Sequence, residues 1–189
     1  MTDQELMQSI KTKWGSLFDS VAAQAPAPPA AFFAALTANE TGGNPLATRQ
    51  EPAVLAALHA VLMNRKPAYG SIGRADILGY AQQITATLNM QLVVAIDQLS
   101  TSYGLVQIMG YEAIPYNLKG ALVLQDPASE LVVALKMLRD FATRSQLDLA
   151  SDFSELFDCW NTGRPHAPTF DPAYIPNGLQ RMQVYQALP

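Results

Sequence analysis

Apolar residues recur at helical spacing from the beginning of the chain. Leu6, Ile10 and Trp14 return every fourth residue, and Thr2 with Glu5 forms the pattern of a capping box in front of them. In such a box the threonine and glutamate side chains satisfy backbone N–H groups that the first helical turn leaves unpaired. We therefore expect an amphipathic helix at this end of the chain.

A proline-rich segment, 22–29, separates this helix from a second one. Proline removes a backbone donor and restricts the residue before it, so the segment is expected to act as a linker. The next residues, 30–39, are almost wholly apolar, and Gly42 and Gly43 form a typical helix stop. We predict a buried second helix here, with Glu40 in its last turn.

Apolar periodicity and strong helix formers predict more helices farther along the chain. The expected segments are 53–64, 74–87, 90–99, 126–145 and 153–161. Strand signals are weak. The apolar run 92–96 is compatible with a helix or with a short buried strand, because periodicity does not separate the two over so few residues. The sequence thus predicts a mainly α fold.

Composition limits the classes of partner. The chain has 189 residues, 49% of them hydrophobic and 15% charged, with a net charge of −4. This balance favours a compact core and gives no basic surface for nucleic acid, so we expect no nucleic-acid partner. No apolar stretch reaches the roughly 20 residues of a membrane span, and the acidic start is unlike a secretory signal. We expect synthesis in the cytoplasm and no membrane insertion.

The cysteine and the two histidines do not form a recognisable disulfide, metal or nucleophile site in the sequence. Cys159 is the only cysteine, so no internal disulfide is possible, and we expect it to be buried. His59 lies in an apolar helical run and is predicted to be packed, whereas His166 lies in a proline-flanked turn. Two histidines without a nearby carboxylate cluster make a poor metal site. We therefore predict neither a metal ion nor a cofactor.

Glu40 is the strongest candidate for catalysis. A carboxylate in the last turn of an apolar helix meets the negative end of the helix dipole and apolar neighbours, and both favour its protonated form. A protonated carboxyl is the proton donor of glycosidases. The segments 49–52, 102–110 and 160–163 mix glycine, amide, hydroxyl or charged groups with apolar or aromatic residues, which suits a polysaccharide groove.

Three segments carry motifs that resemble those of one family. Glu40–Thr41, followed by Gly43–Pro45, resembles a Glu-Ser motif with a nearby Asn-Pro. Gly104–Ile108, with Ser102 two residues before it, is similar to a Gly-Leu-Met-Gln-Ile motif, and Trp160–Gly163 resembles Tyr-Asn-Ala-Gly. In this order they resemble the lytic transglycosylases of the soluble and goose-type lysozyme-like superfamily.

A fourth segment places the resemblance in a subgroup. Arg49, Glu51 and Pro52 resemble an Arg-Tyr-Glu-Pro element that accompanies a long insert between the first two motifs, common in phage and prophage proteins. The resemblance implies a lysozyme-like helical domain at 30–189, with a helical insert at about 49–101. The N-terminal helix and linker, 1–29, would form an arm before it.

The resemblance implies cleavage of the β-1,4 bond between N-acetylmuramic acid and N-acetylglucosamine, with Glu40 as the sole acid and base and 1,6-anhydromuramoyl products. The protein would act as a monomer on the glycan strands of the cell wall. It would reach them by phage lysis, as part of a virion or through a secretion apparatus. Two alternatives stay open: a hydrolytic muramidase, and a non-catalytic glycan-binding or structural component. The expected substrate-binding residues are Thr41, Ser102, Tyr103, Gln107, Trp160, Asn161 and Tyr174.

Three questions stay open at the motif segments. Trp160 stands where the family has a tyrosine, so a hydroxyl that could hold the acid is missing there, and Tyr103 or Tyr174 could replace it. Gln107 could fix a loop or contact a sugar. Glu51 could form an ion pair with the nearby arginine, which we favour, or hold a hydrolytic water.

Overall fold

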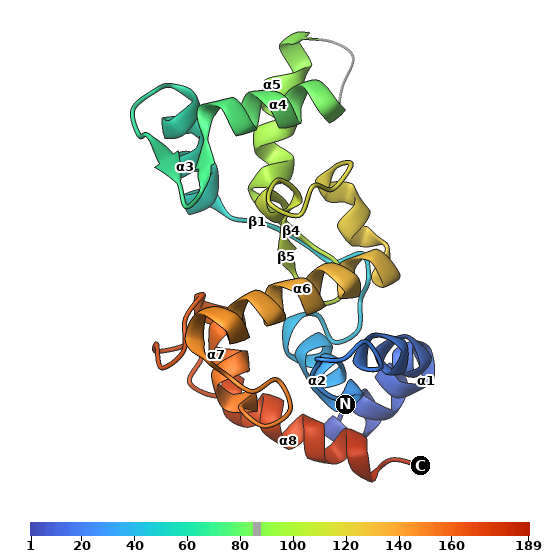
Figure 1. Cartoon of the computed structure of the whole chain (residues 1–189). Coiled ribbons are helices and arrows are strands. Elements are labelled where there is room, and N and C mark those ends of the chain that lie inside the picture. The colour runs from blue at the N-terminus through green and yellow to red at the C-terminus, as the bar shows by residue number, and fades with distance from the viewer. Residues whose placement is uncertain (85–87) are drawn as a thin grey trace. The chain divides into compact units, whose positions relative to one another are not determined.

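The computed structural model describes residues 1–84 and 88–189, and helices dominate it (Figure 1). The mainly α prediction is confirmed. Each predicted helix is present within a few residues of its expected bounds, except that 85–87, the end of one of them, lies outside the described residues. The run 92–96 lies inside helix α5 (Leu88–Leu99), so the alternative of a buried strand is wrong.

The chain divides into two compact units. Unit 1 comprises residues 1–44 and 131–189, and unit 2 comprises residues 45–130. The predicted boundary after residue 29 therefore falls within unit 1, and the predicted insert, 49–101, falls within unit 2. Unit 1 contains α1 (Asp3–Ala22), α2 (Ala30–Glu40), all but the first residues of α6 (Pro127–Ser145), α7 (Phe153–Thr162) and α8 (Tyr174–Ala187).

Helix α2 is the centre of unit 1. All residues from Ala31 to Ala38 are buried, as expected of a helix that is apolar on every side. Helices α1 and α8 both pack against it, and α7 packs against α8. The N-terminal helix, predicted as an arm, therefore contributes to the core of this unit, where Met7, Ile10 and Phe18 are buried. The predicted capping box of Thr2 and Glu5 is present.

Helix α8 is not predicted by the sequence pattern. Pro176 and Gly178 both weaken a helical pattern, but each has a place in this one. Pro176 lies in the first turn, where its missing N–H is not needed. A Cβ atom at Gly178 would lie only 2.8 Å from the ring of Phe157, so glycine lets α8 approach α7 closely. Helix α8 begins at Tyr174, four residues before this close approach.

Unit 2 combines helices with short strands. Its helices are α3 (Pro52–Leu62), α4 (Arg74–Ile84), α5, and the 3-10 turns η1 (Gly110–Ala113) and η2 (Ala121–Gln125). Its strands are β1 (Thr48–Gln50), β2 (Ala68–Tyr69), β3 (Ile72–Gly73), β4 (Thr101–Tyr103) and β5 (Ile108–Met109). The antiparallel order β1-β4-β5 aligns Arg49 with Ser102 and Ser102 with Met109, which brings two of the motif segments together.

The longest helix among the described residues, α1, has 20 residues. None of their helices combines the length and the apolar character that crossing a membrane requires.

Candidate functional site

Glu40 ends helix α2, as predicted, and its carboxyl group is held by a tyrosine. Tyr174, the first residue of α8, is 8% exposed, and its hydroxyl donates a hydrogen bond to Glu40 Oε1. Tyr103 and Tyr174 are the two candidates to replace the hydroxyl missing at Trp160. The hydrogen bond shows that Tyr174 contacts Glu40. Both residues belong to unit 1.

The surroundings of Tyr174 keep its hydroxyl a donor. Its ring lies edge-on to that of Phe157, with centroids 6.3 Å apart, and its backbone oxygen accepts a hydrogen bond of 2.9 Å from Asn39 Nδ2. Burial raises the pKa of the Tyr174 hydroxyl, and the negative charge of the nearby Glu40 raises it further. The phenol therefore stays protonated and donates to the Glu40 side chain.

A chain of polar contacts extends from this pair to helix α1. Arg181 of α8 donates from Nη1 to Asn39 Oδ1 at 2.7 Å, and from Nε to Asp3 Oδ1 at 3.0 Å. The oxygen of the Asn39 amide thus faces Arg181, and its nitrogen faces Tyr174. Residues on α1, α2 and α8 are joined in this way around the end of α2.

The turn after Glu40 is also attached to α1. The backbone oxygen of Gly43 accepts a hydrogen bond of 3.3 Å from Trp14 Nε1. Gly43 has a φ of +91°, and a Cβ there would lie 3.1 Å from Ile10 Cγ1, so both conformation and space favour glycine. Thr41, predicted to bind sugar, directs its hydroxyl to Thr37 O at 3.3 Å.

Trp160 and Asn161 lie in the last turns of α7, the tryptophan partly exposed and the asparagine exposed. The loop that follows is tied back to the helix by Asp158, whose carboxylate accepts hydrogen bonds from the backbone N–H of Ala167 (3.0 Å) and the hydroxyl of Thr162 (3.4 Å). This loop leads directly to the start of α8. The glycan contacts of Trp160 and Asn161 stay predictions.

In unit 2, Gln107 binds its own loop. Its Nε2 donates to the backbone oxygens of Ala47 (3.1 Å) and Gly104 (3.0 Å), and its Oε1 accepts a hydrogen bond of 2.7 Å from Ser102. Both amide hydrogens are used within the protein, which favours the loop-fixing interpretation. Ser102 and Tyr103, predicted to line the groove, are buried in strand β4, at 2% and 5% exposure.

The side chain of Glu130, which no sequence pattern singles out, binds the backbone of the same loop. The side chain of Glu130, at the start of α6, is fully buried and accepts hydrogen bonds from the backbone N–H groups of Leu105 (2.7 Å) and Val106 (2.8 Å). A Cβ at Gly104 would lie 2.3 Å from the Glu130 carboxyl carbon, so only glycine fits. The one sequence feature that could have indicated a buried Glu130 is its position directly before the apolar run 131–135.

Burial determines how Glu130 titrates. Removal from water raises the pKa of this carboxyl to about 8, although the two N–H donors act in the opposite direction. Neither ion pair found among the described residues, Arg49–Glu51 and Arg181–Asp3, includes it. The loop of the Gly104–Ile108 motif therefore depends on a buried carboxyl group that forms no ion pair among the described residues and favours its protonated form.

Three smaller predictions have clear outcomes. The Arg49–Glu51 ion pair is present at 2.6 Å, on side chains 72% and 30% exposed, so the favoured interpretation of Glu51 is confirmed. Cys159 is buried as expected. His59 is exposed on α3, so the prediction that it is packed was wrong, because the apolar run around it is only partly covered. Among the described residues no cluster suited to a metal ion is found.

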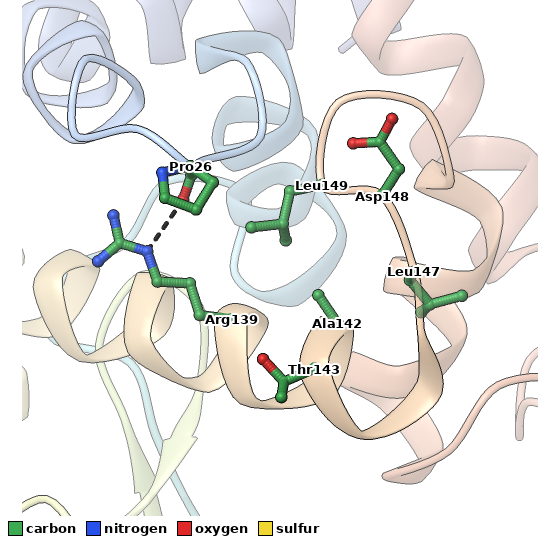
Figure 2. A pocket seen from close by; sticks show the side chains of 7 residues that line it. All are labelled: Pro26, Arg139, Ala142, Thr143, Leu147, Asp148 and Leu149. Carbon is green, nitrogen blue, oxygen red and sulfur yellow. Dashed lines mark hydrogen bonds between the residues drawn. The ribbon is translucent and has the colours of Figure 1, made fainter.

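Two pockets lie apart from the predicted residues. One, of about 430 Å³ in unit 1, has Arg139 at its edge, whose Nε donates to Pro26 O at 2.9 Å (Figure 2). The other, of about 420 Å³ in unit 2, lies beside the edge-to-face pair of Tyr69 and Tyr111. Neither pocket is lined by a residue predicted to bind substrate.

Comparison with known proteins identifies no relative of this chain. No family model matches the chain, and neither a curated protein nor a solved structure matches it. The functional interpretation therefore depends on the motif resemblance and on the geometry around Glu40.

The Glu130 carboxyl gives a pH-dependent prediction. Its folded-state pKa of about 8 exceeds the ordinary value of 4.5, so the folded state binds the proton more tightly. The stability that this group contributes is complete below pH 4.5 and is lost as pH rises towards 8, with a slope of up to about 1.4 kcal/mol per pH unit. Urea denaturation of the wild type and Glu130→Gln from pH 5 to 8 measures this.

The difference in unfolding free energy between the two proteins isolates Glu130, because the other titrating groups are shared. We expect the wild type to lose stability relative to the glutamine variant as pH rises. A difference that stays constant over this range would mean that the carboxyl is already ionised at pH 5.

Proposed function

We propose that this chain is a peptidoglycan lytic transglycosylase in which Glu40 is the sole acid and base. One observation carries the proposal: the candidate acid, at the end of a buried helix, accepts a hydrogen bond from the buried Tyr174 hydroxyl. The contact fixes one carboxyl oxygen of Glu40 while the side chain stays partly exposed, as a proton donor to a bound glycan requires. The substrate and the reaction are inferred from the motifs, which resemble those of the family and occur in the same order.

The proposed reaction needs one protein carboxyl group. Glu40 gives its proton to the glycosidic oxygen as the bond between that oxygen and C1 of N-acetylmuramic acid breaks, and the acetamido oxygen of the same sugar bonds to C1. The Glu40 carboxylate then takes the proton of the sugar's 6-hydroxyl. The O6 atom bonds to C1 as the acetamido oxygen leaves, which closes the 1,6-anhydro ring and restores the acid.

Tyr174 suits both stages of this cycle. Its hydroxyl fixes Oε1 of Glu40, so the proton for the glycosidic oxygen would be carried on Oε2. After proton transfer the same hydroxyl donates to a full negative charge, and hydrogen bonds to charged groups are stronger than those to neutral ones. Since the phenol keeps its proton, it does not compete with Glu40 as a base.

The proposal is tested by digesting purified peptidoglycan and weighing the released muropeptides by mass spectrometry. We expect 1,6-anhydro products, one water lighter than hydrolysis products and without a reducing end. Glu40→Gln, which keeps the size of the side chain but has no acidic proton to give, should release nothing above background.

The alternatives predict other outcomes of the same digestion. Products with reducing ends would make the protein a muramidase, in which water takes the place of the 6-hydroxyl. Equal release by the wild type and Glu40→Gln would remove Glu40 from catalysis. Binding of intact glycan without any release would indicate a non-catalytic glycan-binding component.

Removal of the Tyr174 hydroxyl should slow turnover. A hydrogen bond to a charged group contributes about 1.5–3 kcal/mol, which corresponds to a roughly ten- to hundredfold lower kcat for Tyr174→Phe. The measurement is the rate of release from soluble peptidoglycan oligomers.

Tyr185→Phe is the matched control. Tyr185 is also a buried tyrosine of α8, but its ring packs against Phe18 and under the Lys11 ammonium. We expect this variant to keep the wild-type rate. Equal losses in the two variants would assign the effect to the packing of α8, and an unchanged rate in Tyr174→Phe would show that Glu40 does not need the phenol.

A further inference from the structure

Arg181 links three helices through one side chain. From its position on α8 it donates Nε to Asp3 of α1 and Nη1 to Asn39 of α2, the residue directly before Glu40. Its side chain is only 18% exposed. We infer that Arg181 is a positioning residue: it sets the Asn39 amide, and through it the first turn of α8 that presents Tyr174 to Glu40.

The chemistry of the two side chains makes this link directional. A guanidinium group only donates hydrogen bonds, so it must face the oxygen of the Asn39 amide. The amide nitrogen then faces the backbone oxygen of Tyr174, to which it donates at 2.9 Å. The Tyr174 carbonyl, which only accepts, favours the same orientation of the amide, so Arg181 and Tyr174 together hold Asn39 between them.

The ion pair with Asp3 alone is not expected to matter much for stability. The pair is only partly buried, with the Asp3 side chain 30% exposed, and a partly solvated pair gains little net free energy once its desolvation is counted. The forked geometry is the important feature, because it places two N–H groups in fixed directions towards α1 and α2 at once. Helix α1 thereby takes part in placing the phenol that holds Glu40.

The test begins with Arg181→Gln and a matched control, Arg139→Gln. Arg139 also lies in unit 1, and its guanidinium also spans two acceptors, the backbone oxygens of Pro26 and Gln24. We expect the Arg139 variant to keep the turnover rate of the wild type, whatever its effect on melting temperature. A third variant, Arg181→Lys, keeps the positive charge but not the fork.

The kinetic result rests on the proposed function. With soluble peptidoglycan oligomers, we expect Arg181→Gln to lower kcat about tenfold with little change in KM, since a small displacement of a catalytic group is costly. Arg181→Lys should restore little of that rate. In a Tyr174→Phe background the Arg181 substitution should have no further effect. An equal loss in both backgrounds, or full rescue by lysine, would overturn the inference.

A second readout does not need activity. With ¹³C at the ring carbon that bears the hydroxyl, the NMR signal of Tyr174 is assigned as the one missing from Tyr174→Phe. Glu40→Gln should shift this signal, because the acceptor of the hydroxyl changes from a carboxyl oxygen to an amide group. Arg181→Gln should shift it too, and Arg139→Gln should not.

The two readouts separate the two proposals. A Tyr174 signal that Arg181→Gln leaves unchanged would overturn the positioning inference, even in a fully active enzyme. A wild-type protein that releases no product, but whose Tyr174 signal responds to Arg181→Gln, would refute the transglycosylase proposal and leave the positioning role of Arg181 standing.

Discussion

The hydrogen bond from Tyr174 to Glu40 joins residues 134 positions apart, and the rest of unit 1 can be understood as the support for it. The acceptor ends a helix that is buried on all sides, and the donor begins a helix that packs along it. Both helix ends are held by further contacts, through Phe157, Asn39 and Arg181. The candidate acid is thus placed by core packing instead of by a mobile loop.

Two glutamates show how environment assigns different roles to the same group. Glu130 is fully buried, receives two backbone N–H groups and holds a loop in unit 2. Glu40 lies at a helix end, is partly exposed and is held by a phenol. A carboxyl group enclosed by protein has no route to a substrate, whereas one that is fixed yet still reaches the surface can exchange a proton with a ligand.

Local patterns allowed much of the fold to be predicted, because apolar spacing and helix stops are properties of neighbouring residues. They located α2 and Glu40 at its end. They did not locate α8, because Gly178 is explained only by the ring of Phe157, twenty-one positions earlier. Tyr174 was named as one of two candidates to replace the hydroxyl missing at Trp160. Sequence alone could not decide between Tyr174 and Tyr103 as the partner of Glu40, because the choice depends on the packing of α8 on α2. The roles of Arg181 and Glu130 likewise depend on contacts with residues distant in the sequence.

The most direct test of this account is a crystal structure of Glu40→Gln with a bound peptidoglycan oligomer. The account predicts a glycosidic oxygen within hydrogen-bonding distance of residue 40, with the Tyr174 hydroxyl still on the other side of that side chain. Glycan bound elsewhere on the protein, with residue 40 and Tyr174 touching no sugar, would contradict it.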